Sequence, residues 1–375
     1  MACPICLTSE TETILEKTHI PVFASLKPKS YSEERRFDAV LLRCLSCGYV
    51  SQKLTPELEA FLADFYTKEE SFFTTPPTQE KPGPRVVQTI EYLKSFVSSP
   101  VESILEIGAY DGFFLEQIRK AFSSTRTVGI EISNTFNMYE DITLVHDVYP
   151  STQVEGETFD LIVCMNVLEH IFTPREFMEK IGKNLSDTGH VLIEIPNEEY
   201  AFSIGAPSFQ HQHISYFTPR TIERFLSSVG FRIDGMYTQD LDRMLIVCSK
   251  QQSSQVSTAT DPSASGYRER LEHSIQRFVS EMQDGPIGLY GACTLTNNML
   301  AFVGGDLGSL RVYDGDERKW NHYMSDVSSP IQGWKEIDSA GLKKVLIMPH
   351  SFSTEIMTFL SGQKLITPVQ EFWKS

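Results

Sequence analysis

A short loop, FQHQHISYF at residues 209–217, carries side chains that could move protons. His211 and His213 flank Gln212, and Tyr216 follows shortly after them. An imidazole titrates near neutral pH and can act as a general acid or base, whereas an amide neither takes nor gives a proton. The loop is therefore predicted to be the acid–base part of an active site, with His213, His211, Gln212 and Tyr216 as its catalytic residues. The alternative is a polar loop whose histidines simply bind backbone.

A glycine turn, ILEIGAYDGFFLEQI, follows a buried strand that ends near Ile107. Gly108 and Gly112 allow the backbone to turn tightly and to approach a ligand closely. Glu106 lies at the end of the strand, and Glu131 ends the next apolar run, VGIEIS, about 20 residues after the turn. An acid in that place can accept hydrogen bonds from both hydroxyls of a ribose.

The spacing of the glycines favours S-adenosylmethionine over a dinucleotide. A dinucleotide site would have a third glycine near position 113, at the helix start that binds pyrophosphate, and Phe113 stands there. S-adenosylmethionine has no phosphate to bind. Asp147 and Asn166 lie near the ends of the next two strands, Asp147 as a partner for the adenine amine. The predicted donor-binding residues are Glu106, Gly108, Tyr110, Gly112, Glu131, Asp147 and Asn166. The alternatives are a loop-ordering or capping role for Glu106 and a purely structural Asp147.

Two CxxC pairs, CPIC and CLSCG, place thiolates where they could bind one metal ion. Cys3, Cys6, Cys44 and Cys47 would form a tetrahedral four-sulfur zinc site. All four positions would be filled by sulfur, so the ion is predicted to be structural rather than catalytic. The alternatives are two disulfides or free thiols.

The elements that would position these residues fall into four parts. Residues 1–75 are predicted to form a zinc-binding region, residues 76–250 a methyltransferase domain, residues 251–266 a Ser- and Thr-rich linker, and residues 267–375 a second, smaller domain. Short apolar runs alternate with helical stretches in both larger parts, which is typical of parallel sheets. The predicted fold class is α/β, a class I Rossmann-like methyltransferase domain with a smaller Rossmann-like C-terminal domain.

Charge and composition argue against a nucleic-acid or membrane partner. The net charge is −16 and no Lys/Arg cluster stands out, which argues against a nucleic-acid partner. No apolar run is long enough for a membrane helix, and MACPICLTSETE lacks the basic start and apolar core of an export signal. The expected location is therefore the cytoplasm and the expected partner a small molecule. The oligomeric state, monomer or homodimer, is left open.

Taken together, the motifs resemble the C-methyltransferases that act on nucleotide-linked keto-deoxysugars. The resemblance rests on CPIC, CLSCG, ILEIGAYDG, GIEIS, NVLEHI, IEIP, HQHISYF, GLYGA and VYDGD, in this order. It implies an N-terminal zinc region, a central S-adenosylmethionine domain and a C-terminal Rossmann-like domain. It also implies a reaction in which a base removes the proton beside the sugar ketone, and the resulting carbanion attacks the sulfonium methyl group.

The chain departs from this family in the proton-transfer loop. The family reads Tyr-His-Glu-His there, whereas this chain has Gln210 and Gln212 in place of the Tyr and the Glu. A further family tyrosine falls near ESFFTTPP, where Phe72 and Phe73 stand and the nearest phenol is Tyr66. Three interpretations follow: C-methylation with His213 as the base, methylation of oxygen or nitrogen on another small molecule, or a module that binds S-adenosylmethionine without transfer.

The second α/β unit offers weaker candidates. Gly288 and Gly291 could approach a phosphate, Asp314 could bind a ribose, and His350 ends the last long strand. Leu295 stands near the place of a family lysine. The alternative is a relic of a nucleotide-binding unit that now serves packing and closure over the substrate.

Overall fold

The computed structural model describes residues 2–22, 35–65, 82–97, 100–133, 139–251, 259–305, 307 and 310–374. Tyr66, Phe72 and Phe73 lie outside these residues. The chain forms two compact units, each built from separated segments. Unit 1 contains residues 1–12, 43–197 and 213–262, and unit 2 contains residues 13–42, 198–212 and 263–375. The predicted division into four parts stays a prediction.

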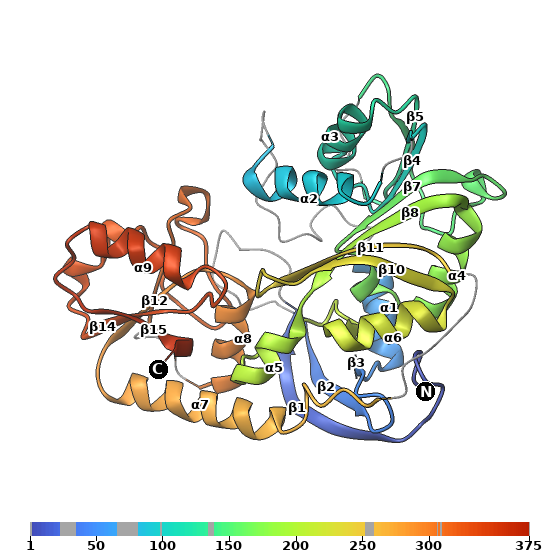
Figure 1. Cartoon of the computed structure of the whole chain (residues 1–375). Coiled ribbons are helices and arrows are strands. Elements are labelled where there is room, and N and C mark those ends of the chain that lie inside the picture. Colours follow the sequence, from blue (N-terminus) through green and yellow to red (C-terminus); the bar gives the residue numbers. More distant parts are fainter. Residues whose placement is uncertain are drawn as a thin grey trace. The chain divides into compact units, whose positions relative to one another are not determined.

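A seven-stranded sheet forms the centre of unit 1 (Figure 1). Its strands, in spatial order, are β10 (Phe231–Tyr237), β11 (Arg243–Lys250), β8 (Leu185–Pro196), β7 (Phe159–Met165), β4 (Ser103–Ile107), β5 (Arg126–Ile130) and β6 (Thr143–Val145). The five strands from β8 to β6 are parallel, and β11 runs antiparallel to both β8 and β10. The short apolar runs noted in the sequence are these strands.

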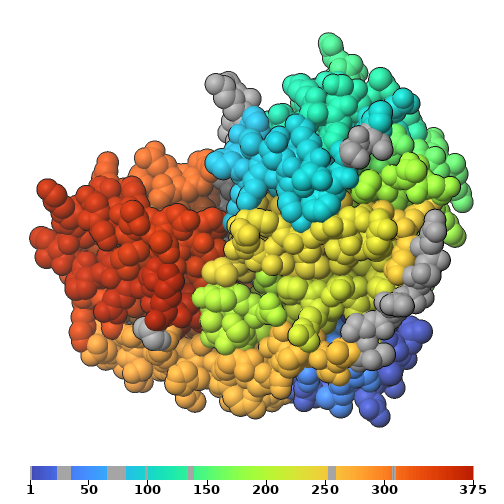
Figure 2. All heavy atoms as spheres, viewed as in Figure 1, coloured from blue at the N-terminus to red at the C-terminus, as the bar shows by residue number. Residues whose placement is uncertain are grey.

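Helices cover both faces of this sheet, which explains why its strands are apolar along their whole length. Ile104 and Leu105 are neighbours in β4 and belong to different core clusters, because successive side chains point to opposite faces. Leu93 and Leu115 pack with Ile104, whereas Ile181 packs in the cluster of Leu105. The helices of unit 1 are α1 (Pro56–Phe65), α2 (Pro84–Lys94), α3 (Phe113–Phe122), α4 (Pro174–Asn184) and α6 (Pro219–Ser228). Figure 2 shows α2, in light blue, on the visible surface.

The strand order reverses next to β4. The chain continues from β4 to β5 and β6 on one side, and it returns to β7 and β8 on the other. Ligands of open α/β sheets bind beyond the carboxyl ends of the strands at such a switch point. The fold therefore directs attention to the residues that follow β4, β5, β6 and β7.

Unit 2 contains a second parallel sheet, in the order β13 (Arg311–Tyr313), β12 (Ile287–Tyr290), β14 (Lys344–Ile347) and β15 (Val369–Glu371). Its helices are α5 (Glu198–Ile204), α7 (Tyr267–Gln283), α8 (Thr294–Val303) and α9 (Ser353–Gly362). The predicted α/β class, with a second and smaller Rossmann-like domain, is confirmed.

The remaining strands are short or lie near the N-terminus: β1 (Thr11–Pro21), β2 (Arg36–Cys44), β3 (Val50–Gln52) and β9 (Ser215–Tyr216). Within unit 1, β3 pairs antiparallel with β9. Hydrogen bonds between these strands therefore hold the end of the FQHQHISYF loop. Among the described residues, no helix combines the length and the apolar character needed to cross a membrane.

Candidate active site

The glycine turn after β4 has the backbone that its sequence predicts. Gly108 has φ +73° and Gly112, which precedes α3, has φ +76°. A Cβ atom on Gly108 would lie 2.6 Å from Cγ2 of Val167, the residue after Asn166. Position 108 therefore tolerates neither the strain nor the volume of a side chain, and the turn passes close to the end of β7.

Glu131 closes this turn from the neighbouring strand end. Its carboxylate accepts a hydrogen bond from the Tyr110 backbone N–H at 2.8 Å and another from the Ser133 N–H at 2.8 Å. The side chain is buried. A carboxylate has about four lone-pair positions, so it can order the turn and still accept ribose hydroxyls.

Glu106 is buried at the end of β4, with 2% of its surface exposed. Burial, followed by the negative charges of Asp111 and Glu131, raises the pKa of Glu106 well above its usual range. Among the described residues, its Oε2 atom has no hydrogen-bond partner. A cationic donor group would supply that partner and restore the charged form. The site therefore fits S-adenosylmethionine, whose amino-acid end carries an ammonium group.

Asp147 and Asn166 follow the strands β6 and β7. Asp147 accepts from the Val148 N–H at 2.8 Å and from the Ser151 hydroxyl at 2.7 Å, and the Ser151 bond lowers the pKa of Asp147. Asn166 has φ +53° and its backbone N–H donates to the Glu194 carbonyl oxygen at 2.8 Å. Its side-chain amide donates to Glu194 Oε1 at 3.2 Å.

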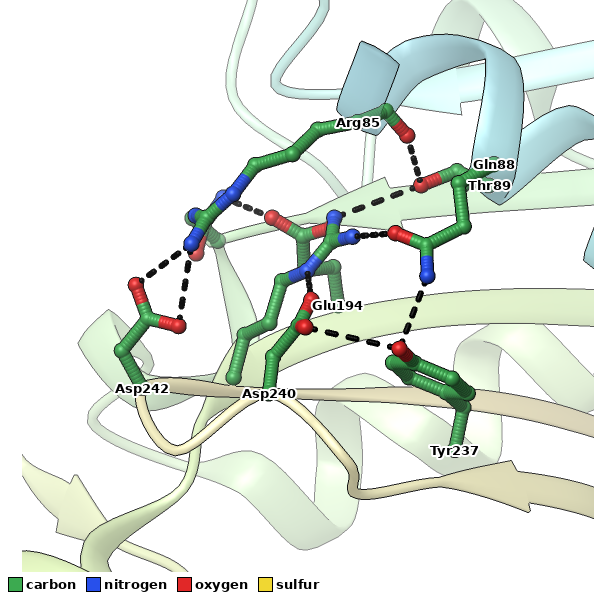
Figure 3. A network of polar contacts seen from close by, with 9 residues as sticks. Arg85, Gln88, Thr89, Glu194, Tyr237, Asp240 and Asp242 are labelled. Atoms are coloured by element: carbon green, nitrogen blue, oxygen red, sulfur yellow. Dashed lines mark hydrogen bonds and ion pairs between the residues drawn. The ribbon is translucent and has the colours of Figure 1, made fainter. Parts of the chain in front are cut away.

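Glu194 belongs to a network of polar contacts that also contains Gln88, Thr89 and Asp240 (Figure 3). An arginine that sequence reasoning missed holds Glu194 in place. Arg243, buried at the start of β11, donates to Glu194 Oε2 at 2.8 Å and to Asp240 Oδ2 at 2.7 Å. It also donates to Gln88 Oε1 at 2.7 Å and to the Thr89 hydroxyl at 3.3 Å, both on α2. The available signals were a charged residue in each of two apolar runs, Glu194 in IEIP and Arg243 in RMLIVC.

His213 lies beside two residues that follow β7. The Ile214 N–H donates to the Glu169 carbonyl oxygen at 2.7 Å, which brings His213 next to the 3₁₀ turn η2 (Leu168–His170). The His170 and His213 rings meet edge to face with centroids 4.9 Å apart. His170 Nε2 lies 3.9 Å from Glu169 Oε1. Burial, and then the nearby His170, lowers the pKa of His213 well below its usual range. The His213 imidazole is therefore neutral and a weak base.

Tyr216 is buried in β9 and its ring centroid lies 6.0 Å from that of His213. The 3₁₀ turn that carries His170 follows Val167, whose side chain lies against Gly108 of the predicted donor site. Burial and the negative charges of Glu169 and Glu106 raise the pKa of Cys164, a buried residue of β7. Cys164 is thus near both carboxyl groups. His170 and Glu169 stood out in the sequence only as part of NVLEHI.

His211 and Gln212 belong to unit 2, whereas His213 and Tyr216 belong to unit 1. His211 Nε2 donates to the Ile20 carbonyl oxygen at 3.0 Å, and its ring packs edge to face on Phe209 at 4.9 Å. Burial lowers the pKa of His211 to about 4. Asn298 of α8 supports the preceding segment through the carbonyl oxygens of Pro207, at 2.8 Å, and Phe209. Gln212 lines a small hollow of the same unit with Gln210.

The four predicted zinc ligands converge in unit 1. The Sγ atoms of Cys3 and Cys47 are 3.5 Å apart, as are those of Cys6 and Cys44. All four sulfur atoms lie within 4.8 Å of one another. The donor set fits a closed tetrahedral zinc site, because the sulfur atoms would fill every position.

In unit 2, Asp314 at the end of β13 takes the place that Glu131 has in unit 1. It accepts from the Ala292 N–H at 2.8 Å, from the Asp316 N–H at 2.9 Å and from Lys319 Nζ at 3.0 Å. Gly291 lies against Pro349, which a Cβ would approach to 2.3 Å. His350 Nδ1 and the Ser351 hydroxyl oxygen are hydrogen-bonded at 3.0 Å. The Asp314 carboxylate is thus already paired with a cation.

Parts of this chain are similar to known methyltransferases. A family model described as "Methyltransferase domain" matches residues 60–234. The ubiquinone biosynthesis O-methyltransferase of Hydrogenovibrio crunogenus is 23% identical over 168 residues, which cover 38% of this chain and 66% of that protein. The alignment therefore spans slightly less than two thirds of the relative.

Two solved structures are also similar. The 1,6-didemethyltoxoflavin-N1-methyltransferase of Burkholderia thailandensis is 12% identical, with a TM-score of 0.40 over 56% of this chain and 99% of that chain. An S-adenosylmethionine-dependent methyltransferase of Mesorhizobium loti is 12% identical, with a TM-score of 0.36 over 42% and 95%.

The family model covers the strands on both sides of the switch point next to β4. Residues 60–234 match the methyltransferase model, and they include the glycine turn, Glu131 and the segment after β7. The chain therefore carries an S-adenosylmethionine-dependent methyltransferase domain, as predicted. The assignment of individual residues to the donor, to catalysis and to zinc stays a prediction.

Proposed function

We propose that the chain transfers a methyl group from S-adenosylmethionine to an oxygen atom of a small molecule, with His213 assisting removal of the hydroxyl proton. The donor supplies a methyl group on a positively charged sulfur. Glu131 binds its ribose hydroxyls, Glu106 and the backbone at Gly108 receive its amino-acid end, and Asp147 and Asn166 border the adenine. Zn²⁺ on the four cysteines orders the N-terminal segment.

The state of His213 is the observation that carries the choice of oxygen. Its imidazole is buried and its pKa is lowered, so it is a weaker base than an exposed histidine. A carbon beside a ketone holds its proton far more tightly than a hydroxyl does, and its removal needs a stronger base. A hydroxyl, which needs only modest assistance, suits this site better. The curated relative is named an O-methyltransferase, which agrees with the proposal.

C-methylation of a nucleotide-linked keto-deoxysugar is the second candidate. It is favoured by the order of motifs from CPIC to VYDGD and by the retained histidines of the HQHISYF loop. Gln212 weighs against it, because the family has a titratable carboxylate at that place and an amide cannot take the proton.

A transfer assay with ¹³C-methyl-labelled donor decides between the two. One acceptor panel holds small molecules with neighbouring hydroxyl or keto oxygens, and the other holds nucleotide-linked keto-deoxysugars. The proposal predicts a product whose labelled methyl has the chemical shift of a methyl ether. It also predicts that His213→Asn lowers kcat by roughly 10²-fold or more while donor binding persists. A product with carbon-bound methyl, formed only from keto-sugars, would establish the second candidate instead.

A further inference from the structure

We propose that Glu169, His170 and His213 form a binding site for one divalent first-row metal ion, which presents open coordination positions to the oxygen atoms of the acceptor. The site lies apart from the four cysteines, and its use in catalysis rests on the proposed function. Each residue offers one ligand atom, and these three atoms lie within 4.8 Å of one another.

The distances are close to those of a shared coordination sphere. Bonds from a metal ion to imidazole nitrogen and carboxylate oxygen are about 2.0–2.2 Å long, so ligand atoms in one sphere lie roughly 3–4 Å apart. His170 Nε2 and Glu169 Oε1 are separated by 3.9 Å. Small rotations of these side chains would bring the three atoms onto one ion.

The backbone fixes the two segments that carry the ligands. The Ile214 N–H donates to the Glu169 carbonyl oxygen at 2.7 Å, and the Gln52 N–H donates to the Ile214 carbonyl oxygen at 3.0 Å. The next residues, Ser215 and Tyr216, pair with β3. His213 is therefore held by backbone hydrogen bonds against the 3₁₀ turn that carries Glu169 and His170, and a metal site needs ligands that are held in this way.

Burial explains why an ion would be stabilising there. Glu169 is 2% exposed and His213 is 7% exposed. A buried carboxylate is stabilised by positive charge next to it. A divalent cation would supply that charge and use both imidazoles as ligands.

The ligand set defines the chemistry. Two imidazole nitrogens and one carboxylate oxygen suit ions such as Mn²⁺, Fe²⁺, Co²⁺ or Zn²⁺, and three protein ligands leave positions open. A cation at this place would lower the pKa of an acceptor hydroxyl. Because the His213 nitrogen would bind the ion, His213 would assist removal of the hydroxyl proton as a ligand, and the proton would leave to solvent. The oxygen would then form its bond to the methyl carbon as the carbon–sulfur bond breaks, and the sulfonium becomes a neutral thioether. The acceptor class is therefore a small molecule with two neighbouring oxygen donors.

Manganese is the probe of choice, because thiolates select softer ions and the cysteine cluster would keep its zinc. The full chain is titrated with Mn²⁺, and free Mn²⁺ is followed by electron paramagnetic resonance. We expect one bound Mn²⁺ per chain, with nitrogen couplings from imidazole in pulsed spectra. Glu169→Gln and His213→Asn should each weaken binding by at least about 10-fold. His273→Ala, which removes an exposed histidine of α7, should leave the affinity unchanged.

Donor binding is measured on the same samples, so the two proposals fail separately. Mn²⁺ binding without S-adenosylmethionine binding would support the metal site and overturn the proposed function. S-adenosylmethionine binding by a wild-type chain that binds no Mn²⁺ or Co²⁺, or that binds Mn²⁺ without nitrogen couplings, would overturn the metal site. Equal affinity in the wild type and in folded Glu169→Gln would overturn it as well.

Discussion

Two acidic residues, Glu131 and Asp314, order the glycine turns of the two Rossmann-like sheets. Each follows the second strand of its sheet, and each accepts a backbone N–H from the glycine turn after the first strand. They differ in what else they meet. Asp314 is paired with Lys319, whereas Glu131 accepts hydrogen bonds from two backbone amides. This difference favours unit 1 as the unit that binds a ribose.

Gly108 provides the sharpest test of the glycine turn. We expect Gly108→Ala to lower the free energy of unfolding by about 1–3 kcal/mol, because φ is +73° and the new Cβ would meet Val167. Adding Val167→Ala should restore only the part that is due to the clash. Urea denaturation measures both effects.

Gly156 is the matched control, since it has φ +77° and nothing lies within 4 Å of its Cβ position. Gly156→Ala should cost only the backbone strain, about 1 kcal/mol. Equal losses for the two glycines would contradict a close approach between the turn and the end of β7.

The lowered pKa of His211 should make the folded chain less stable in acid. Its pKa is about 4 in the folded chain and near 6.5 when unfolded, so the unfolded chain binds the proton first as the pH falls. The contribution of His211 is fully present above pH ~6.5, and its loss proceeds down to pH ~4. At about pH 5 it should cost about 2 kcal/mol.

The measurement compares unfolding free energies at about pH 7.5 and about pH 5 for the wild type and for His211→Gln. Glutamine keeps a donor for the Ile20 carbonyl oxygen and has no proton to gain. The wild type should lose more stability between the two pH values than the variant. An identical loss would show that the His211 imidazole does not resist protonation.

At the scale of elements, Arg243 ties α2 and β11 to the side of β8 that carries Glu194. Replacing it by Met would leave two partly buried carboxylates without their cation, and we expect a loss of about 2–3 kcal/mol in unfolding free energy. Arg85→Met removes a half-exposed ion pair to Asp242 and should cost less than about 1 kcal/mol. Similar losses in the two variants, measured by urea denaturation, would mean that the Arg243 network contributes no more than a surface pair.

The sequence predicted the strands and the glycine turn because their signals are local. An apolar run such as FDLIVCM must be buried on both faces, and a glycine before a helix marks a turn. Contacts between distant segments gave no such signal. Arg243 meets α2 from more than one hundred residues away, as the span from Thr89 to Arg243 shows. The placement of His211 and His213 in different units follows from tertiary packing, which adjacency in the sequence hides.

At the scale of the whole molecule, a mostly parallel sheet in unit 1 and a parallel sheet in unit 2 belong to a chain with a net charge of −16. The four-cysteine cluster connects residues near position 3 with residues near position 47, so it fixes the N-terminal segment within unit 1. A metal ion there would couple binding to local folding.

Zinc content tests this cluster. We expect one Zn²⁺ per chain on the cysteines by elemental analysis, lost in Cys47→Ser, and a lower melting temperature once a chelator has removed it. Cys248→Ser is the control, because Cys248 is a buried residue of β11 outside the cluster. Retention of zinc by Cys47→Ser, or intermolecular disulfides in place of metal, would contradict the assignment.

The most direct test of the central claim is calorimetric titration of the purified chain with S-adenosylmethionine, repeated for Glu131→Gln and Asp187→Asn. The two variants remove the same charge, but Glu131 is buried at the turn and the side chain of Asp187 is 97% exposed. We expect micromolar binding by the wild type and by Asp187→Asn. Glu131→Gln should bind at least about 10-fold more weakly. An amide has only one acceptor oxygen, so it cannot accept hydrogen bonds from both the N–H groups of the turn and the ribose hydroxyls. Absence of binding by folded wild-type chain, or equal affinity in all three proteins, would contradict a donor site at the end of β5.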